Sequence, residues 1–395
     1  MSTEIQRRQS AIRMRLAGKT VTWICQQLQR GRDWFYTWWG RYQDQGADGL
    51  RDQSRAPKTN PRAIADEVRQ AILTIRDRLV RQRGPQARYR LAGTPTIRHE
   101  LEVLGYAPLP SLRAIGRVLQ GAGRTSPAFR LEPTATTPAY PGPRARFSNH
   151  LHQLDLVGPR YLKGSRTRYY FLVYKDVYDL TPFIGFFRAP DLGVVLSFLV
   201  QAWQRLGLPQ ILQVDNGVLF AGTGRWPGSL DRFIRLALLV GVELVFIPEG
   251  EPFRNGSVEN FNGWFQERLL AIPLHGPAHV RRELKVLMEI CFREHVHPQL
   301  GFRTSCEVRR DLQPRRLPAN FRAHLQPMPI AIGKITFIRK VRRSGRITIL
   351  GVKIRVGKRL SGRYVQAILY TRNAKLKIHH GHKLIKIVDF PIRGV

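Results

Sequence analysis

The chain has 395 residues and an ordinary hydrophobic share of 43%, which allows about two to four domains with their own cores. Its 65 Lys and Arg against 28 Asp and Glu give a net charge of +37, so a polyanionic partner is expected. The three cysteines are scattered along the chain, which argues against a disulfide framework. No apolar run approaches the roughly 18 residues of a membrane span. Together these features predict a soluble cytoplasmic protein without membrane partners.

Three short helices are predicted at 4–17, 20–28 and 30–46, with Thr20 as N-cap of the second. This spacing is typical of a helix–turn–helix DNA-binding domain, placed at residues 1–60, and a plain helical bundle with a solvated basic face is the alternative. The side chains expected to contact DNA are Arg30, Arg32, Tyr36, Thr37 and Arg41 near the third helix, then Arg51, Arg55 and Lys58 in a basic strap.

Residues 61–123 predict a second helical unit that is also expected to bind DNA. An amphipathic helix over 62–82 is followed by a helix, a turn and a helix over 96–123. Five prolines in residues 124–146 then predict an extended linker.

After the linker the pattern becomes that of an α/β sheet, placed at residues 147–275. Three strand-like segments come first, at 152–162, 168–178 and 181–189. Helices at 191–207, 229–241 and 256–271 then alternate with strands at 209–217 and 242–248. Residues 276–330 are expected to be helical and then irregular. Short strands between glycine turns over 331–395 predict a small, basic β-barrel that binds DNA, with Arg342 and Arg343 among its contacts.

The positive charge is distributed unevenly between these regions. Residues 147–275 hold 12 Lys and Arg against 11 Asp and Glu, whereas residues 331–395 hold 17 against 1. The basic excess therefore flanks a nearly neutral middle, which argues against a uniformly basic ribosomal-type protein.

Three acids in the neutral middle are candidates for catalysis. Asp155 interrupts an apolar strand, Asp215 ends another in the stretch QVDNG, and Glu259 begins a helix whose polar stripe continues with Asn262 and Gln266. Carboxylates gathered at one sheet edge repel each other unless a proton or a metal relieves them. Mg²⁺ accepts such ligands, and two ions can clamp both oxygens of a phosphoryl displacement.

The ordered acids in HQLDLVGP, QVDNG and RNGSVENFNGWFQERL resemble the integrase-type core of DDE transposases. The sequence looks most like bacterial insertion-sequence transposases with N-terminal helix–turn–helix domains, and GADGLRDQSRAPK and HVHPQLGFRTSCE strengthen the likeness over roughly residues 5–310. The resemblance implies a multidomain chain: an all-α helix–turn–helix N-terminal region, an α/β ribonuclease H-like core and the small C-terminal β-barrel.

The resemblance also implies roles. Asp155, Asp215 and Glu259 would be both the catalytic residues and the ligands of two Mg²⁺ ions, for which Mn²⁺ would substitute. The enzyme would cut transposon ends in double-stranded DNA and join them to target DNA, as a homo-oligomer associated with the bacterial nucleoid. Arg254, Asn262 and Gln266 would contact DNA beside the acids.

The sequence departs from the family pattern at several positions. The gap of 44 residues between Asp215 and Glu259 is long, with a glycine-rich insertion at 220–228, and Ser257 replaces a common Lys or Arg. Two alternatives stay open: a non-catalytic, domesticated DNA-binding regulator, and an RNase H-like nuclease acting on RNA–DNA hybrids.

Overall fold

The computed structural model describes residues 4–52, 64–82, 84–125, 139–222 and 226–393. The chain divides into two compact units, Met1–Ala63 and Ile64–Val395. None of the helices in these described ranges combines the length and apolar character needed to cross a membrane. The predicted contacts Arg55 and Lys58 and most of the predicted linker lie outside the described residues.

The first unit contains the three predicted helices. They are α1 (Glu4–Leu16), α2 (Val21–Leu28) and α3 (Arg32–Gln45), followed by the 3₁₀ turn η1 (Gly46–Leu50). The predicted N-cap is confirmed, because the Thr20 side chain accepts a hydrogen bond from the Trp23 amide. Ala11, Ile24 and Phe35 form the buried centre of this small bundle.

The second unit begins with a helical module. Its helices α4 (Asp66–Arg81), α6 (Thr94–Val103) and α7 (Leu112–Gly121) bury Ile72, Ile97 and Ile115 together. The short helix α5 (Pro85–Tyr89) was not predicted. It joins the module to α12 (Gly276–Arg293), since Tyr89 Oη donates a 2.7 Å hydrogen bond to Glu283.

The rest of the second unit is built on a nine-stranded mixed sheet in the order β13-β12-β11-β8-β5-β4-β1-β2-β3. The parallel centre consists of β1 (Leu151–Arg160), β4 (Ile211–Val214), β5 (Glu243–Phe246) and β8 (Lys334–Lys340). The antiparallel strands β2 (Tyr169–Asp176) and β3 (Pro182–Phe187) form one edge. The predicted α/β core is therefore confirmed as a mixed sheet.

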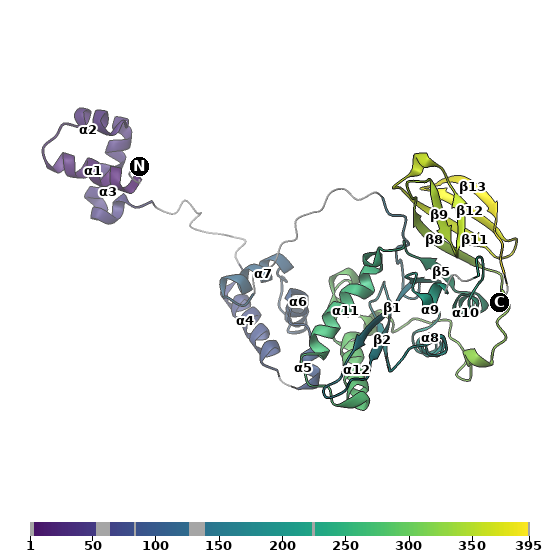
Figure 1. The fold of residues 1–395 in the computed structure, drawn as a ribbon. Coiled ribbons are helices and arrows are strands. Elements are labelled where there is room, and N and C mark those ends of the chain that lie inside the picture. Colours follow the sequence, from purple (N-terminus) through teal and green to yellow (C-terminus); the bar gives the residue numbers. More distant parts are fainter. Residues whose placement is uncertain (1–3, 53–63, 83, 126–138, 223–225, 394–395) are drawn as a thin grey trace. The chain divides into compact units, whose positions relative to one another are not determined.

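Helices cover both faces of this sheet, and β2 supplies apolar side chains to each face. In β2, Leu172 and Tyr174 face α8 (Leu192–Leu206) and α10 (Arg232–Leu239). The alternating residues Phe171 and Val173 face α11 (Gly256–Leu269) and α12. Helices α11 and α12 lie together on one side of β1 and β2, with α8 on the other (Figure 1).

The prediction of a separate small β-barrel over 331–395 is not confirmed. Four of its strands, β8, β11 (Tyr364–Tyr370), β12 (Lys375–His380) and β13 (Lys383–Asp389), extend the core sheet, shown in yellow in Figure 1. The remaining pair, β9 (Arg346–Ile349) and β10 (Val352–Arg355), forms a hairpin of its own. The reason is apolar matching between β5 and β8, where Phe246 stacks on Phe337 with ring centroids 5.1 Å apart.

A buried polar network fixes the start of β1 on the side away from α11. Asp176 accepts hydrogen bonds from Arg309 at 2.7 Å and from the Asn149 amide at 2.6 Å, and lies 3.0 Å from His152 Nε2. Burial opposes ionisation, but His152 and Arg309 outweigh it and hold the pKa of Asp176 below its usual value. The carboxylate therefore stays charged and paired inside the fold.

We predict that Phe337→Ala destabilises the whole second unit by about 3–5 kcal/mol, because Phe337 is fully buried against the core strand β5. Urea unfolding followed by circular dichroism should show one shifted transition for this unit. Ile332→Ala, at a side chain that is 74% exposed, is the matched control and should change stability little. Two transitions, of which only one moves, would show that 331–395 is an independent domain after all.

Candidate active site

The structure brings Asp155 and Asp215 to neighbouring positions on one face of the sheet. Strands β1 and β4 run parallel, with Gln153 aligned to Gln213. Two residues further along each strand, Asp155 follows Gln153 on the same face and Asp215 follows Gln213 just after β4 ends. Both side chains are half-buried on the α11 side.

The QVDNG stretch forms a turn that holds its own carboxylate. Asp215 Oδ1 accepts a 2.9 Å hydrogen bond from the Gly217 amide. Asn216 is fixed from two sides: it donates to the Ile247 carbonyl and accepts from Arg339 Nη2, both at 2.6 Å. The turn and the candidate catalytic role are compatible, since the turn sets the position of Asp215.

Buried amide groups hold the first turn of α11 and the preceding turn η2 (Pro252–Asn255) against the same face. Gln153 Oε1 accepts from the Val258 amide at 3.0 Å, which caps an unpaired donor of the helix. Gln213 donates to Asn255 Oδ1, and Asn255 donates to the Leu154 carbonyl, both at 3.1 Å. Because these three amide side chains are at most 5% exposed, they fix which residues of α11 face β1.

This register places Glu259 and Asn262 on the helix beside the two aspartates. Asn262 Nδ2 donates a 2.6 Å hydrogen bond to Asp155 Oδ2, and Glu259 lies one helical turn before Asn262. The other oxygen of Asp155 accepts from the Leu156 amide at 2.9 Å. Asn262 Oδ1 is buried and has no hydrogen-bond partner within the part of the chain that the structure describes.

The electrostatics agree with a shared site. Burial, then the charges of Asp215 and Glu259, raise the pKa of Asp155 to about 6, against the effect of its two hydrogen bonds. Burial also raises the pKa of Asp215, which the Gly217 amide partly offsets, and raises the pKa of Glu259. The neighbouring carboxylates therefore oppose the ionisation of Asp155, as like charges that share one site do.

The donor set fits a hard divalent cation. Two carboxylates at adjacent positions, both with raised pKa values, are ligands that Mg²⁺ accepts while keeping waters. Asn262 Oδ1 is a further oxygen in the same place whose hydrogen-bonding capacity is unused. Across the described ranges, however, no three His, Cys, Asp or Glu side chains converge as a ready metal site, so Glu259 does not close around the aspartates here.

The predicted DNA contacts of the first unit are only partly available. Tyr36 is 58% exposed, and Arg32 and Thr37 are also exposed on α3. Several predicted cations already interact within the unit: Arg32 donates to Thr22 at 2.9 Å, Arg30 pairs with Glu4, and Arg41 lies over Trp38. Arg51 is 3.6 Å from Asp48, but its side chain is 77% exposed.

The predicted contacts of the second unit also differ in their surroundings. Arg342 and Arg343 are exposed after β8, with Arg342 3.5 Å from Glu249. Gln266 accepts from Arg160 Nη2 at 2.6 Å instead of facing solvent.

Arg254 is held inside the fold, where it joins η2 to strand β11. Its Nε pairs with Glu251 at 3.1 Å, and its Nη2 donates to Tyr364 Oη at the same distance. The guanidinium also lies 4.1 Å from the centre of the Tyr140 ring. These contacts leave Arg254 fewer free donors for DNA than the sequence suggests.

The residues that hold the acids in position were not predicted from the sequence. Gln153, Gln213, Asn255, Lys175 and Arg339 are each at most 8% exposed. A signal was present for two of them, since Gln153 and Gln213 precede Asp155 and Asp215 by two residues in otherwise apolar strands. Polar residues at this spacing share a strand face with the acid that follows.

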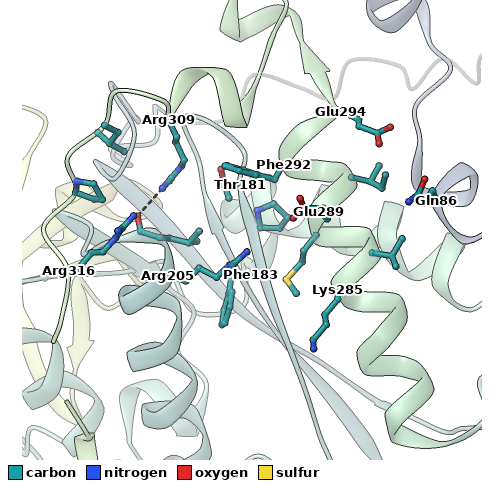
Figure 2. A pocket seen from close by; sticks show the side chains of 17 residues that line it. Gln86, Thr181, Phe183, Arg205, Lys285, Glu289, Phe292, Glu294, Arg309 and Arg316 are labelled. Carbon is teal, nitrogen blue, oxygen red and sulfur yellow. Dashed lines mark hydrogen bonds between the residues drawn. The ribbon is translucent and has the colours of Figure 1, made fainter. Parts of the chain in front are cut away.

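A cavity of about 810 Å³ lies elsewhere in the second unit. It is bounded by β3, the end of α8, helix α12 and the chain near Arg309, and Figure 2 shows Arg205, Arg309 and Arg316 facing Lys285, Glu289 and Phe292 across it. None of the three candidate acids lines it. Its position on the far edge of the sheet gives it no part in chemistry at the carboxylates.

Comparison with known proteins gives a match for the first unit: residues 7–58 match the helix–turn–helix domain family. Among solved structures, the chain is similar to a simian T-cell lymphotropic virus intasome in complex with PP2A regulatory subunit B56 gamma (16% identity, 75% of this chain and 93% of that chain, TM-score 0.39). It is also similar to the HTLV-2 integrase catalytic core domain in complex with magnesium (19% identity, 42% and 99%, TM-score 0.32). A third is the catalytic core domain of BIV integrase (18% identity, 40% and 93%, TM-score 0.32).

We predict that Asp155→Asn stabilises the protein at pH 7 by on the order of 1–3 kcal/mol. The folded state binds the Asp155 proton more tightly than the unfolded state, so this group favours folding at low pH and loses that effect as pH rises through about 6. The amide removes the charge, its oxygen can accept from the Leu156 amide, and its NH2 group can donate to Asn262 Oδ1 once the Asn262 side-chain amide turns over. Urea unfolding should show the gain at pH 7 and none at pH 4.

The exposed acid Glu267, on the same helix, supplies the control for this measurement. Glu267→Gln should leave stability nearly unchanged at both pH values, because its side chain is 80% exposed. A loss of stability in Asp155→Asn at pH 7 would contradict the repulsion inferred for the site.

Proposed function

We propose that the protein is an integrase-type DNA transposase that binds the ends of its element, cuts them and joins them to target DNA. The observation that carries this proposal is the placement of Asp155 and Asp215 side by side on parallel strands, with Glu259 on the helix that crosses the same face. The helix–turn–helix match of residues 7–58 and the net charge of +37 supply the means of holding DNA.

The roles proposed for the chain's own residues follow from their contacts. Asp155 and Asp215 would hold divalent cations, each oriented by one backbone amide, from Leu156 and Gly217. Asn262 would keep the Asp155 carboxylate turned toward Asp215. Glu259 would complete the ligand set once a cation draws it in, because it is half-buried and, among the described residues, lacks the hydrogen bonds that hold the other two.

Two Mg²⁺ ions, or Mn²⁺ in their place, would supply Lewis-acid activation of a water or a 3′-hydroxyl and would stabilise the leaving oxygen. The protein's part is to fix the carboxylates before DNA arrives. Its buried amide side chains contribute to this without titrating themselves.

DNA binding is proposed to involve both units. Helix α3 offers Arg32, Tyr36 and Thr37 on its exposed side, in the position of a recognition helix. Arg342 and Arg343 offer exposed charge after β8 in the second unit. Joining two element ends requires two bound ends at once, so an active homo-oligomer is part of the proposal.

We predict that Asp155→Asn, Asp215→Asn and Glu259→Gln each lower Mg²⁺-dependent cleavage of the element's end DNA by at least about 100-fold while binding of that DNA persists. The measurement is the cleavage and joining of labelled end duplexes, with gel-shift binding in parallel. Glu267→Gln on the same helix is the matched control and should keep wild-type rates, because its side chain is 80% exposed.

Three outcomes would contradict parts of this proposal. Full activity in any one of the three variants would remove that residue from the site. Tight end binding by the wild type without Mg²⁺- or Mn²⁺-dependent cleavage would favour the DNA-binding regulator instead. Cleavage of RNA–DNA hybrids in preference to duplex DNA would favour the nuclease.

We also predict steep salt dependence of DNA binding. With on the order of 8 phosphate contacts, the slope of log K against log salt concentration should be about −7. Fluorescence anisotropy over a range of KCl concentrations measures it. A nearly flat response would contradict an electrostatic role for the basic flanks.

A further inference from the structure

The peptide group between Ser257 and Val258 is held at both of its polar ends. Gln153 Oε1 accepts from the Val258 amide at 3.0 Å, and Lys175 Nζ donates to the Ser257 carbonyl at 3.1 Å. Gln153 and Lys175 are directly opposite each other on β1 and β2, so their side chains share one face of the sheet. This peptide group immediately precedes Glu259.

Lys175 has no role in the chemistry proposed above, yet its position is an unusual one for a lysine. The side chain is only 8% exposed, and its ammonium lies 5.4 Å from the centre of the Phe261 ring. Lysine is almost never buried unless its charge is compensated. Among the described residues no carboxylate is hydrogen-bonded or ion-paired to it, and the Ser257 carbonyl is its hydrogen-bond acceptor.

The groups around Lys175 leave it as the main local charge. Burial raises the pKa of Cys291 on α12, so that thiol is neutral. Burial also lowers the pKa values of His295 and His297 to about 4, and both imidazoles are neutral at pH 7. Asp176, the next residue on β2, is already paired with Arg309, and Arg268 of α11 adds a second positive charge near Cys291.

We propose that Lys175 and Gln153 form a clamp on the Ser257–Val258 peptide group that positions Glu259 for catalysis. Lys175 is thus a positioning residue, and this inference rests on the proposed role of Glu259. The first turn of a helix is where its backbone frays, because its amides lack partners within the helix. A clamp at both ends of one peptide group restrains that turn where the third carboxylate emerges.

The arrangement favours position over stability. A charge-assisted hydrogen bond is stronger than a neutral one, whereas burial of an ammonium is unfavourable. An apolar side chain of similar length would fill the same space more favourably but would release the Ser257 carbonyl. Clamp strength and global stability should therefore change in opposite directions when Lys175 loses its charge.

A pH dependence follows from the same burial. Burial lowers the pKa of Lys175 to about 8, and the charge of Asp176 partly offsets this effect. Between pH 8 and the ordinary value of 10.5, the unfolded chain binds this proton more readily than the folded one, so global stability gains from Lys175 as pH rises. The clamp itself weakens as pH rises through about 8, because the neutral amine formed in the folded state is a poorer donor.

The test is hydrogen–deuterium exchange of the full chain, without DNA or metal, in the wild type and in Lys175→Met. Amides of residues 258–262 should exchange about tenfold faster in the variant, while the urea midpoint stays equal or rises. Lys285→Met, at an exposed lysine of α12, is the control and should match the wild type in both measurements. In the wild type, exchange corrected for its intrinsic pH dependence should rise by about threefold from pH 7 to pH 9, and Lys175→Met should lack this rise.

Activity gives a second, separable result. If the proposed function holds, Lys175→Met should raise the Mg²⁺ concentration needed for half-maximal cleavage several-fold, with unchanged DNA affinity. Unchanged exchange in residues 258–262, or equally faster exchange throughout α11 and β2, would overturn the clamp. If Lys175→Met exchanges faster in residues 258–262 but the wild type does not cleave DNA, the clamp is supported and the proposed function is refuted. The failure of one proposal can therefore be distinguished from the failure of the other.

Discussion

The candidate site depends on the buried amide contacts that set the register of α11 on the sheet. Gln153, Gln213 and Asn255 connect β1, β4 and η2 through hydrogen bonds of 3.0–3.1 Å. A helix packed through apolar contacts alone could slide or rotate by a fraction of a turn at little energetic cost. Directional hydrogen bonds between fully buried groups remove this freedom, because breaking one leaves a polar atom without a partner. Asn262 reaches Asp155 only in the resulting register.

The same face concentrates negative charge that the surroundings do not neutralise. Burial and the charges of Asp215 and Glu259 raise the pKa of Asp155, and no Arg or Lys is paired with any of the three acids among the described residues. A structural carboxylate in this protein behaves differently: Asp176 is more deeply buried but is compensated by Arg309 and His152. Adjacent carboxylates without a positive partner destabilise the folded state when they ionise, unless a cation binds between them. The contrast with Asp176 supports the metal-binding role proposed for the site.

Much of the fold was predictable because local patterns specify local structure. The three N-terminal helices, the Thr20 cap and the alternation of strands and helices after residue 147 all appear in the periodicity of apolar residues. The C-terminal strands were recognised as strands but assigned to a separate barrel. The alternation of apolar and polar residues predicts that a strand exists, but it does not predict which strand it pairs with. The pairing of β8 with β5 depends on a contact between Phe246 and Phe337, which are 91 positions apart in the sequence.

The candidate site was predictable to a similar extent. Acids that interrupt or end apolar strands are conspicuous, so Asp155 and Asp215 could be identified. The turn that follows Asp215 could also be predicted from its Asn-Gly pair. Of the supporting groups, only Gln153 and Gln213 carried a signal, two residues before each acid. A buried Asn, Lys or Arg has no periodic signature and acquires its meaning from a partner in another element. Arg254 and Gln266 illustrate the converse: polar side chains near the acids looked like DNA contacts, yet their partners in the structure are Tyr364 and Arg160.

The central claim is that Asp155 and Asp215 share a divalent cation with Glu259 nearby. The most direct measurement is a crystal structure of the protein soaked with Mn²⁺, using anomalous scattering to locate the metal. The account predicts an anomalous peak between the Asp155 and Asp215 carboxylates, with the Glu259 side chain turned toward it. A Mn²⁺ peak elsewhere, with these carboxylates uncoordinated at saturating metal, would contradict it.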